Sequence, residues 1–247
     1  KERGGKMTAL RELVYMPISE LSEKIQKKAI SPVEVTQAML SRGDELEPQL
    51  HAFNTIFRDE VLEAAHAAEA EIQRGEYRGP LHGVPIGIKD IYECGPTTCG
   101  SQSLEHYVAE KDCTSVAKLK EAGALILGKT ATYEFAYGFP TNQSYYKPTH
   151  NPWNLAYDAG GSSSGTAAST AAGMAYAGMG SCTGGSTRWP AQCCGIVGLK
   201  ATYGRVSRAG VYPLSWSLDH TGPLTRSVTD AALMLQGCAG YDPLDPA

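Results

Sequence analysis

Apolar side chains return every three to four positions in two early stretches of the chain, residues 31–46 and residues 59–74. This spacing places them on one face of a helix. The first stretch starts at Ser31 and Pro32, a capping serine followed by proline at the first helical position, and the second stops at a glycine. Together with the segment before them, these stretches predict three helices within residues 17–74, with a scaffold role.

From residue 79 onward the pattern changes to short apolar runs. Residues 84–88 and 123–128 predict buried strands, with a helix at 115–122 between them. Residues 165–180 predict a further helix and strand. Because strands that alternate with helices are typical of layered α/β architectures, we expect an α/β fold.

We expect one domain, in which the helical segment of residues 1–78 packs on an α/β core of residues 79–247. Within the core, residues 139–158 are rich in Pro, Asn, Tyr and Thr and predict a long irregular loop. Residues 197–200 predict a short strand, and Ser227 is the cap of a last helix. Neither an internal repeat nor a linker sequence divides the chain.

Composition narrows the classes of function. The 247 residues are 42% hydrophobic, enough for a folded core, and the net charge is -4. This balance has no basic patch and argues against a nucleic-acid partner, and no apolar run approaches the roughly 20 residues of a membrane span. The polar start lacks the apolar region of a secretory signal. We therefore expect a soluble, cytoplasmic protein without membrane contact.

The seven cysteines and six histidines show no metal-binding pattern. The cysteines are odd in number and lack the dense spacing of a disulfide framework, so reduced thiols are expected. The histidines are scattered, and neither a C-x-x-C nor an H-x-x-x-H pair occurs. We therefore predict no metal site.

Residues 160–188 stand out because they carry no acidic side chain and a single basic one, Arg188. Serine, threonine, glycine and alanine make up most of the stretch. A polar linker has a similar composition, but this stretch runs into a mostly apolar segment at residues 189–199. We therefore predict that it is buried, with a helix over residues 163–176 packed tightly between other elements.

Two serine clusters flank this predicted helix. Ser162 precedes Ser186 by 24 residues, so an outgoing helix and a returning strand can bring the two hydroxyls together. The second cluster begins with Thr183, Gly184 and Gly185, whose glycines let successive N–H groups converge on an anion. Such a nest beside a hydroxyl fits the oxyanion of acyl transfer, and a phosphate nest would look similar.

A different serine motif competes with this interpretation. Residues 161–165 match G-x-S-x-G, the nucleophile elbow, with Ser163 as the nucleophile. An elbow needs a buried strand directly before it, and residues 151–160 do not predict one. The acid and the histidine that follow, Asp219 and His220, are adjacent in sequence, so their side chains should diverge. The elbow is therefore disfavoured.

Five motifs together resemble the amidase signature family, over residues 21–245. They are GPLHGVPIGIKD from residue 79, PTTCGS from residue 96, NPWNLAYDAGGSSSG from residue 151, TGGSTRWPAQCCGIVGLKATYGRVSR from residue 183 and SLDHTGPLTRSVTDAAL from residue 217. The resemblance implies a mixed, twisted sheet covered by helices. Because family members usually run to nearly twice this length, it also implies an incomplete fold.

The resemblance implies catalysis by a Ser-Ser-Lys triad. Matched residue by residue, Ser186 is the nucleophile, Ser162 the bridging serine and Lys89 the base, and Ser163 is a supporting residue. A cis peptide bond is implied between Gly161 and Ser162. The oxyanion hole is matched by the backbone N–H groups of Thr183, Gly184 and Gly185.

The chemistry of the residues supports the same assignment. A serine hydroxyl needs a base to become a nucleophile, and no histidine is placed to act as one. Lysine serves as a base only when neutral, and burial of Lys89 at the end of its strand would lower its pKa from about 10.4. Taken alone, a charge at a strand end also fits a solvated terminus. The implied reaction is hydrolysis of a small-molecule amide through an acyl-enzyme, without a cofactor.

Two other functions remain open. The chain could be the amide-hydrolysing subunit of a tRNA-dependent amidotransferase, which passes ammonia to a partner. It could also be a non-catalytic remnant that keeps the fold. For an incomplete fold, we expect a homodimer or a second chain that supplies the missing part.

The sequence departs from the family at Cys182, where aspartate is usual. That aspartate is expected to pair with the arginine that matches Arg188 and to hold the glycine turn. A thiol is a weak hydrogen-bond partner and mostly neutral at pH 7. Arg188 must therefore find another carboxylate, draw Cys182 toward the thiolate, or leave the turn looser.

Overall fold

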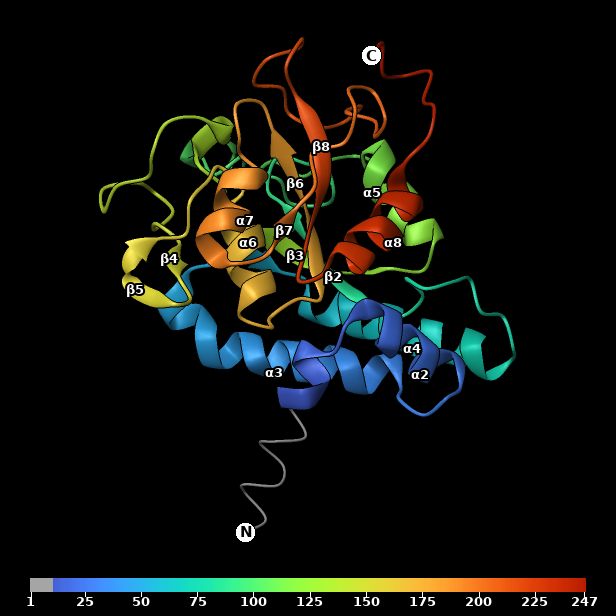
Figure 1. Ribbon diagram of the computed structural model, residues 1–247. Helices are drawn as coiled ribbons and strands as arrows, with labels where there is room; N and C mark the ends of the chain where they lie inside the picture. The colour runs from blue at the N-terminus through green and yellow to red at the C-terminus, as the bar shows by residue number, and fades with distance from the viewer. Residues whose placement is uncertain (1–10) are drawn as a thin grey trace.

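The computed structural model describes residues 11–247, and residues 1–10, with the polar start of the chain, lie outside the described residues. Its centre is a sheet made of β1 (Phe53–Ile56), β2 (Pro85–Lys89), β3 (Leu125–Thr130), β6 (Ala177–Cys182), β7 (Val197–Gly198) and β8 (His220–Thr225). The strand order is β1-β3-β2-β6-β8-β7 (Figure 1). β2 pairs in parallel with β3 and β6, whereas β1, β8 and β7 join antiparallel. The predicted mixed sheet of an α/β fold is confirmed.

The three parallel strands end at one edge of this sheet. Lys89, the last residue of β2, pairs with Thr130 at the end of β3. β6 ends at Cys182, which pairs with His220 at the start of β8. Because the carboxyl ends of parallel strands meet at the same edge, the segments that leave β2 and β6 come together there.

Helices cover both faces of the sheet. On one face α6 (Ser164–Ala171) contacts β2, β3, β6 and β8, and α7 (Arg188–Cys194) packs on α6. On the other face α8 (Val228–Cys238) contacts β8 and α5 (Thr114–Glu121). Figure 1 shows these two groups on opposite sides of the strands.

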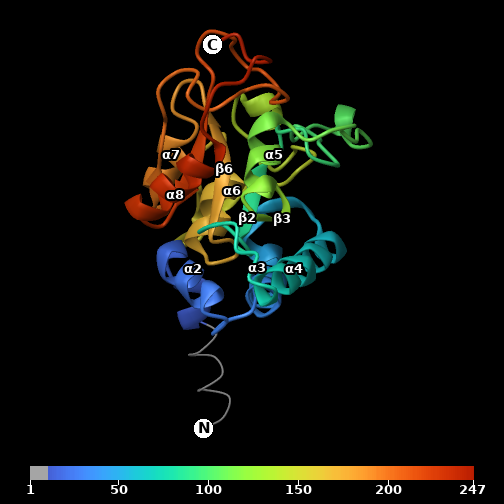
Figure 2. The ribbon, with the colours of Figure 1, turned by 90° about the vertical axis from the view of Figure 1, so that its right-hand side faces the viewer.

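The three predicted N-terminal helices are confirmed. They are α2 (Ile18–Gln26), α3 (Pro32–Leu50) and α4 (Arg58–Gln73), which lie across one end of the sheet (Figure 2). Ser31 caps α3 by accepting a hydrogen bond from the N–H of Val33 at 3.0 Å. Between α3 and α4, β1 adds a half-buried strand of four residues that the apolar pattern did not predict.

α6 is surrounded so closely that large side chains cannot fit. A Cβ at Gly165 would lie 2.2 Å from the carbonyl oxygen of Ala52 and 2.4 Å from the nitrogen of Ala131. All residues of the helix except the last are buried, so the burial predicted from composition is confirmed. The helix ends at Ala171, earlier than predicted, because the chain turns at Gly173, where φ is +70°.

The prediction of an irregular loop over residues 139–158 was wrong in its second half. There β4 (His150–Asn151) and β5 (Asn154–Asp158) form an antiparallel hairpin. The side chain of Asn151 closes the turn by accepting a hydrogen bond from the N–H of Trp153 at 2.9 Å. Every residue of β5 is exposed, so no buried face marks the strand, and proline and asparagine signals dominate the sequence.

The apolar core joins the N-terminal helices to the sheet. Ile18 of α2, Ile86 of β2 and Met234 of α8 are fully buried members of one cluster. All seven cysteines are free, and six of them are buried. Within residues 11–247, no helix combines the length and the apolar character that crossing a membrane requires.

Arg226, just after β8, ties two distant segments together. Its guanidinium donates to the carbonyl oxygens of Thr170 and Ala175 at 3.0 and 2.9 Å, at the end of α6 and beyond it. It also donates to those of Val14 and Met16 at 3.1 and 3.3 Å, in the segment before α2. The side chain of Arg226 therefore provides hydrogen-bond donors for four backbone carbonyl groups in two segments that are far apart in sequence.

Replacing Arg226 with methionine should lower the free energy of unfolding by about 3 kcal/mol, because four carbonyl groups lose a charged donor. Urea denaturation of the variant and the wild type measures the difference. The exposed Arg205, replaced by methionine, is the matched control and should change stability by less than about 0.5 kcal/mol. An Arg226 variant as stable as the control would contradict the structural role.

Candidate active site

Lys89 ends β2, and its side chain is fully buried. Its Nζ lies 2.7 Å from the Oγ of Ser162 and 2.7 Å from the Oγ of Ser181. Burial lowers the pKa of Lys89 to about 7, although the nearby Cys182 and Asp219 oppose this shift. The position is therefore not a solvated strand end, and near neutral pH the amine is partly unprotonated and able to accept a proton.

Ser162 is buried and follows a cis peptide bond after Gly161, as the family resemblance implied. The N–H of Tyr133 donates to the carbonyl oxygen of Ser162 at 3.2 Å, and its ring covers Gly161, where a Cβ would lie 2.2 Å from it. The hydroxyl of Tyr133 donates to Asp158 at 2.9 Å, and Asp158 also accepts from the N–H of Gly160 at 2.6 Å. Gly161 is required because the aromatic ring approaches its backbone closely, and Gly160 because its φ is +75°.

Ser186 lies in the turn that leaves β6 and is half-buried. The N–H of Ser163 donates to its carbonyl oxygen at 3.2 Å, which holds the turn against the start of α6. In the described part of the chain, no hydrogen bond joins the hydroxyls of Ser186 and Ser162. The fold therefore brings the two serine segments into contact, and the two hydroxyls are not bonded to each other.

The turn before Ser186 has the features expected of an anion site. Gly185 has a φ of +140°, and a Cβ at Gly184 or Gly185 would meet nothing within 4 Å. Among residues 11–247, no acceptor receives the N–H groups of Thr183, Gly184 or Gly185. These donors are available to an oxyanion or to a phosphate.

Cys182, the last residue of β6, is buried beside Arg188. Burial raises the pKa of its thiol, but hydrogen bonds from the N–H of Thr187 and from Arg188 lower it by more, so the pKa lies below its usual value. Of the three outcomes that the sequence leaves open, the structure favours attraction of Cys182 toward the thiolate.

Ser163 is buried and faces β6. Its hydroxyl donates to the carbonyl oxygen of Ser181 and accepts from the N–H of the same residue, each at 3.3 Å. The strand that precedes it, β5, belongs to the exposed hairpin. Asp219 and His220 diverge, because Asp219 binds Thr183 while the Nδ1 of His220 contacts a backbone oxygen. These contacts argue against a nucleophile elbow.

Sequence reasoning missed two groups that set the surroundings of Lys89. Ser181 lies on β6, the strand beside β2, and its hydroxyl accepts from the lysine. Asp90 directly follows Lys89 and forms a fully buried ion pair with Lys129, at 3.4 Å. Neither Ser181 nor Asp90 belongs to a periodic sequence pattern that could have revealed its contact with a lysine. These groups come together because β2 lies between β3 and β6 in the sheet.

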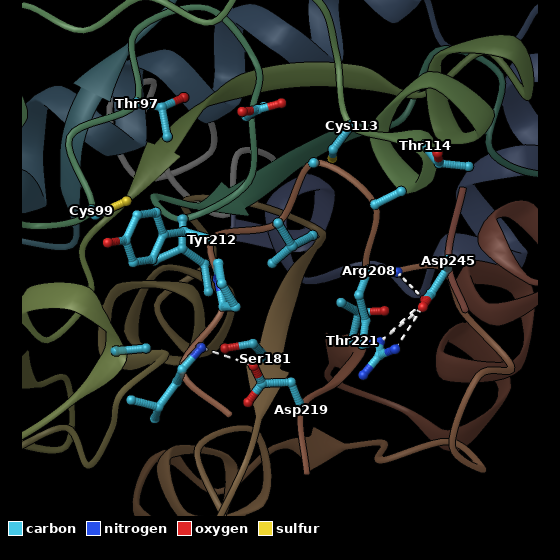
Figure 3. A pocket seen from close by; sticks show the side chains of 18 of the residues that line it. Thr97, Cys99, Cys113, Thr114, Ser181, Arg208, Tyr212, Asp219, Thr221 and Asp245 are labelled. Atoms are coloured by element: carbon cyan, nitrogen blue, oxygen red, sulfur yellow. Dashed lines mark hydrogen bonds and ion pairs between the residues drawn. The ribbon is translucent and has the colours of Figure 1, made fainter. Parts of the chain in front are cut away.

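A cavity of about 740 Å³ adjoins the site, with Ser181 and Thr183 in its lining. Figure 3 shows Asp219 beside Ser181 at one end of this cavity, and Arg208 with Asp245 on another side. Thr183 of the glycine turn belongs to this lining, whereas among the described residues Lys89, Ser162 and Ser186 do not. In the same part of the chain, no group of three or more His, Cys, Asp or Glu side chains is placed to hold a metal ion.

Comparison with known proteins gives a consistent set of matches. The sequence model of the family described as Amidase matches residues 34–247. The glutamyl-tRNA(Gln) amidotransferase A-subunit of Geobacter metallireducens is 50% identical over 236 residues, which cover 95% of this chain and 48% of that protein.

Two solved structures have the same fold. The peptide amidase of Stenotrophomonas maltophilia is 38% identical with a TM-score of 0.88, and the match covers 94% of this chain and 49% of that one. The glutamyl-tRNA(Gln) amidotransferase A-subunit of Thermotoga maritima is 37% identical with a TM-score of 0.79, over 95% and 49% of the two chains. This chain thus spans about half the length of the relatives it matches.

The lowered pKa of Lys89 can be measured without any substrate. Between pH 7 and 10.5 the unfolded lysine holds a proton that the folded lysine has released, so this group makes stability rise with pH. Relative to Lys89→Met, the unfolding free energy of the wild type should rise by about 1.4 kcal/mol per pH unit in that window.

Urea denaturation across the window measures this difference. The exposed Lys27, replaced by methionine, controls for the loss of one positive charge. A constant difference between Lys89→Met and the wild type at all pH values would show that Lys89 keeps its ordinary pKa.

Proposed function

This chain belongs to the amidase signature family, and on that premise we propose that it hydrolyses a carboxamide through an acyl-enzyme on Ser186. The observation that carries the proposal is the buried amine of Lys89, 2.7 Å from Ser162 and with a pKa lowered to about 7. Such an amine is a base at neutral pH, where an exposed lysine is not. A scaffold without chemistry has no need of an uncompensated buried lysine.

The proton route follows from this geometry. Neutral Lys89 accepts the proton of Ser162 as Ser162 takes the proton of Ser186, whose oxygen attacks the amide carbon. The contact between the two serine hydroxyls forms when substrate binds, since catalytic hydrogen bonds are often long or absent in unliganded enzymes. The carbonyl oxygen becomes an oxyanion, which the N–H groups of the glycine turn receive.

The second half of the cycle returns the proton. As the tetrahedral intermediate collapses, the C–N bond breaks, and the amine leaves with the proton that Lys89 held. Water then loses a proton to the same relay, attacks the acyl-enzyme, and releases the acid and Ser186. Every step uses side chains of this chain, so the proposed reaction requires no cofactor.

A second candidate function is ammonia supply within a tRNA-dependent amidotransferase. The 50% identity to the glutamyl-tRNA(Gln) amidotransferase A-subunit of Geobacter metallireducens favours it, although the solved A-subunit of Thermotoga maritima and the peptide amidase are about equally similar to this chain, at 37% and 38%. In this version the released ammonia passes to a partner protein. Weak glutaminase activity without a partner would support this candidate, and rapid turnover of simple amides would support a free-standing amidase.

The remaining proposals concern partners and location. We infer a small-molecule amide as substrate and a cytoplasmic location, because the composition has no basic patch and no membrane-spanning run. Since the chain spans about half the length of its relatives, a further segment, a second chain or a second copy would complete the substrate pocket. Size measurement in solution distinguishes a homodimer from the other two.

A serine-directed phosphonate should label Ser186, because the reagent mimics the acylation step. Ser186→Ala should abolish labelling, and Ser162→Ala should slow it by roughly 10² to 10⁴-fold, since it removes the proton relay. Mass spectrometry of the labelled peptide identifies the site. Ser163→Ala tests the elbow and should still be labelled on Ser186. Label on Ser163 would revive the elbow, and no label at all would indicate a non-catalytic remnant.

Cys182→Asp should preserve or raise both amide hydrolysis and thermal stability. A carboxylate binds the side chain of Arg188 more strongly than a thiol and should hold the glycine turn more firmly. Initial rates and thermal melts of the variant measure both effects. The half-buried Cys193, replaced by serine, controls for loss of a thiol. A Cys182→Asp variant that folds normally but loses activity would show that the thiol has its own role.

A further inference from the structure

Asp219 connects two parts of the site that the proposed mechanism treats separately. One oxygen of its carboxylate accepts a hydrogen bond from the hydroxyl of Thr183, the first residue of the glycine turn. The other oxygen accepts from the N–H groups of Leu214 and Ser215, at 2.8 and 2.9 Å. Both of the latter belong to residues 212–216, most of which line the cavity. A single carboxylate therefore binds the turn and the cavity wall at the same time.

The sheet register brings these groups together. Cys182 at the end of β6 pairs with His220 at the start of β8. The residues just outside this pair, Thr183 and Asp219, therefore meet where the two strands separate. Because a slip of one residue would turn each side chain to the opposite face, the contact depends on this register.

The glycine turn is held at both of its ends. After the turn, Arg188 contacts the thiol of Cys182. At the start of the turn, the hydroxyl of Thr183 donates to the carboxylate of Asp219. Hydrogen bonds to a carboxylate are roughly twice as strong as those between neutral groups, so Asp219 is a strong attachment for the start of the turn.

We propose that Asp219 is a positioning residue, whose carboxylate fixes Thr183 and thereby aims the N–H groups of the glycine turn. This inference rests on the proposed function, because it presumes that the turn receives an oxyanion. Asp219 acts through Thr183 and not on the reacting atoms. By binding Leu214 and Ser215 as well, it keeps the turn at a set distance from the cavity wall.

The same carboxylate has an electrostatic effect that a neutral positioning group would lack. Lys89 is faced by Cys182, Asp219 and Cys99, and each of them favours its protonated form. Asp90 follows Lys89 at the end of β2 and forms an ion pair with Lys129 on β3. This pair contributes one negative and one positive charge near Lys89. Removing the charge of Asp219 should therefore move the titration of Lys89 to lower pH.

The test compares Asp219→Asn, Thr183→Val and the double variant in the intact protein. Loss of an oxyanion donor costs roughly 10² to 10³-fold in kcat, so donors that are only misaimed should cost about tenfold. We expect each single variant to lower kcat by about that factor with KM within about twofold, and the double variant to be no slower than either. Thr183→Ser keeps the hydroxyl and should restore most of the rate.

The pH profile separates positioning from a general structural role. In Asp219→Asn the acid limb of kcat/KM should move to lower pH, whereas in Thr183→Val it should stay in place. Asp59→Asn is the control, because Asp59 is an exposed carboxylate of α4 outside the cavity lining. It should leave both kcat and the acid limb unchanged.

Several results would overturn the inference. Asp219 would not be a positioning residue if the two losses multiplied in the double variant. The same conclusion would follow from a kcat of Asp219→Asn within twofold of the wild type, or from an acid limb that does not move in this variant. If Asp219→Asn does not fold, Thr183→Val and its rescue by Thr183→Ser decide the matter alone. A wild type that the phosphonate does not label at Ser186 would overturn the proposed function, and this inference with it.

Discussion

The site depends on one buried amine. Lys89 reaches the end of β2 with no exposed surface, and its partners are the neutral hydroxyls of Ser162 and Ser181. Burial without a bonded carboxylate disfavours the ammonium and lowers the pKa to about 7. Lys129 on the next strand is buried as deeply, and burial lowers its pKa too, but its contact with Asp90 opposes that shift. Of the two buried lysines, Lys129 is thus half of an ion pair, whereas Lys89 contacts the hydroxyls of Ser162 and Ser181.

Near this amine, glycines allow other parts of the chain to pack directly against the backbone. The Tyr133 ring lies against Gly161, and the walls of α6 leave no room for a side chain at Gly165. These contacts hold the start of α6, and with it Ser162, against Ala52 and the segment that follows β3. The many small residues of the 160–188 stretch are therefore a packing requirement of the site. They are not a sign of flexibility.

The glycine turn is the part of the site in which the sequence predicts a departure from the family pattern. A thiol stands where the resemblance implies aspartate, and Arg188 draws it toward the thiolate instead of pairing with a carboxylate. Asp219 supplies a carboxylate at the other end of the turn, through Thr183. The N–H donors thus remain organised by charged groups, although the charge lies at a different place. The chain belongs to the amidase family, and its glycine turn is held in a way that differs from what the resemblance implied.

The sequence by itself determined the local elements and the chemical types. Apolar spacing predicted α3 and α4, each of which buries one face, and short apolar runs predicted β2 and β3, which are buried along their whole length. The glycine and serine motifs, through their resemblance to a family, pointed to Lys89, Ser162 and Ser186. The exposed hairpin of β4 and β5 was missed because no face of it is buried. Only the tertiary structure decided which groups surround Lys89, since Ser181 and Asp219 reach it through strand order and register. Those pairings join residues that are far apart in sequence, and no local pattern contains them.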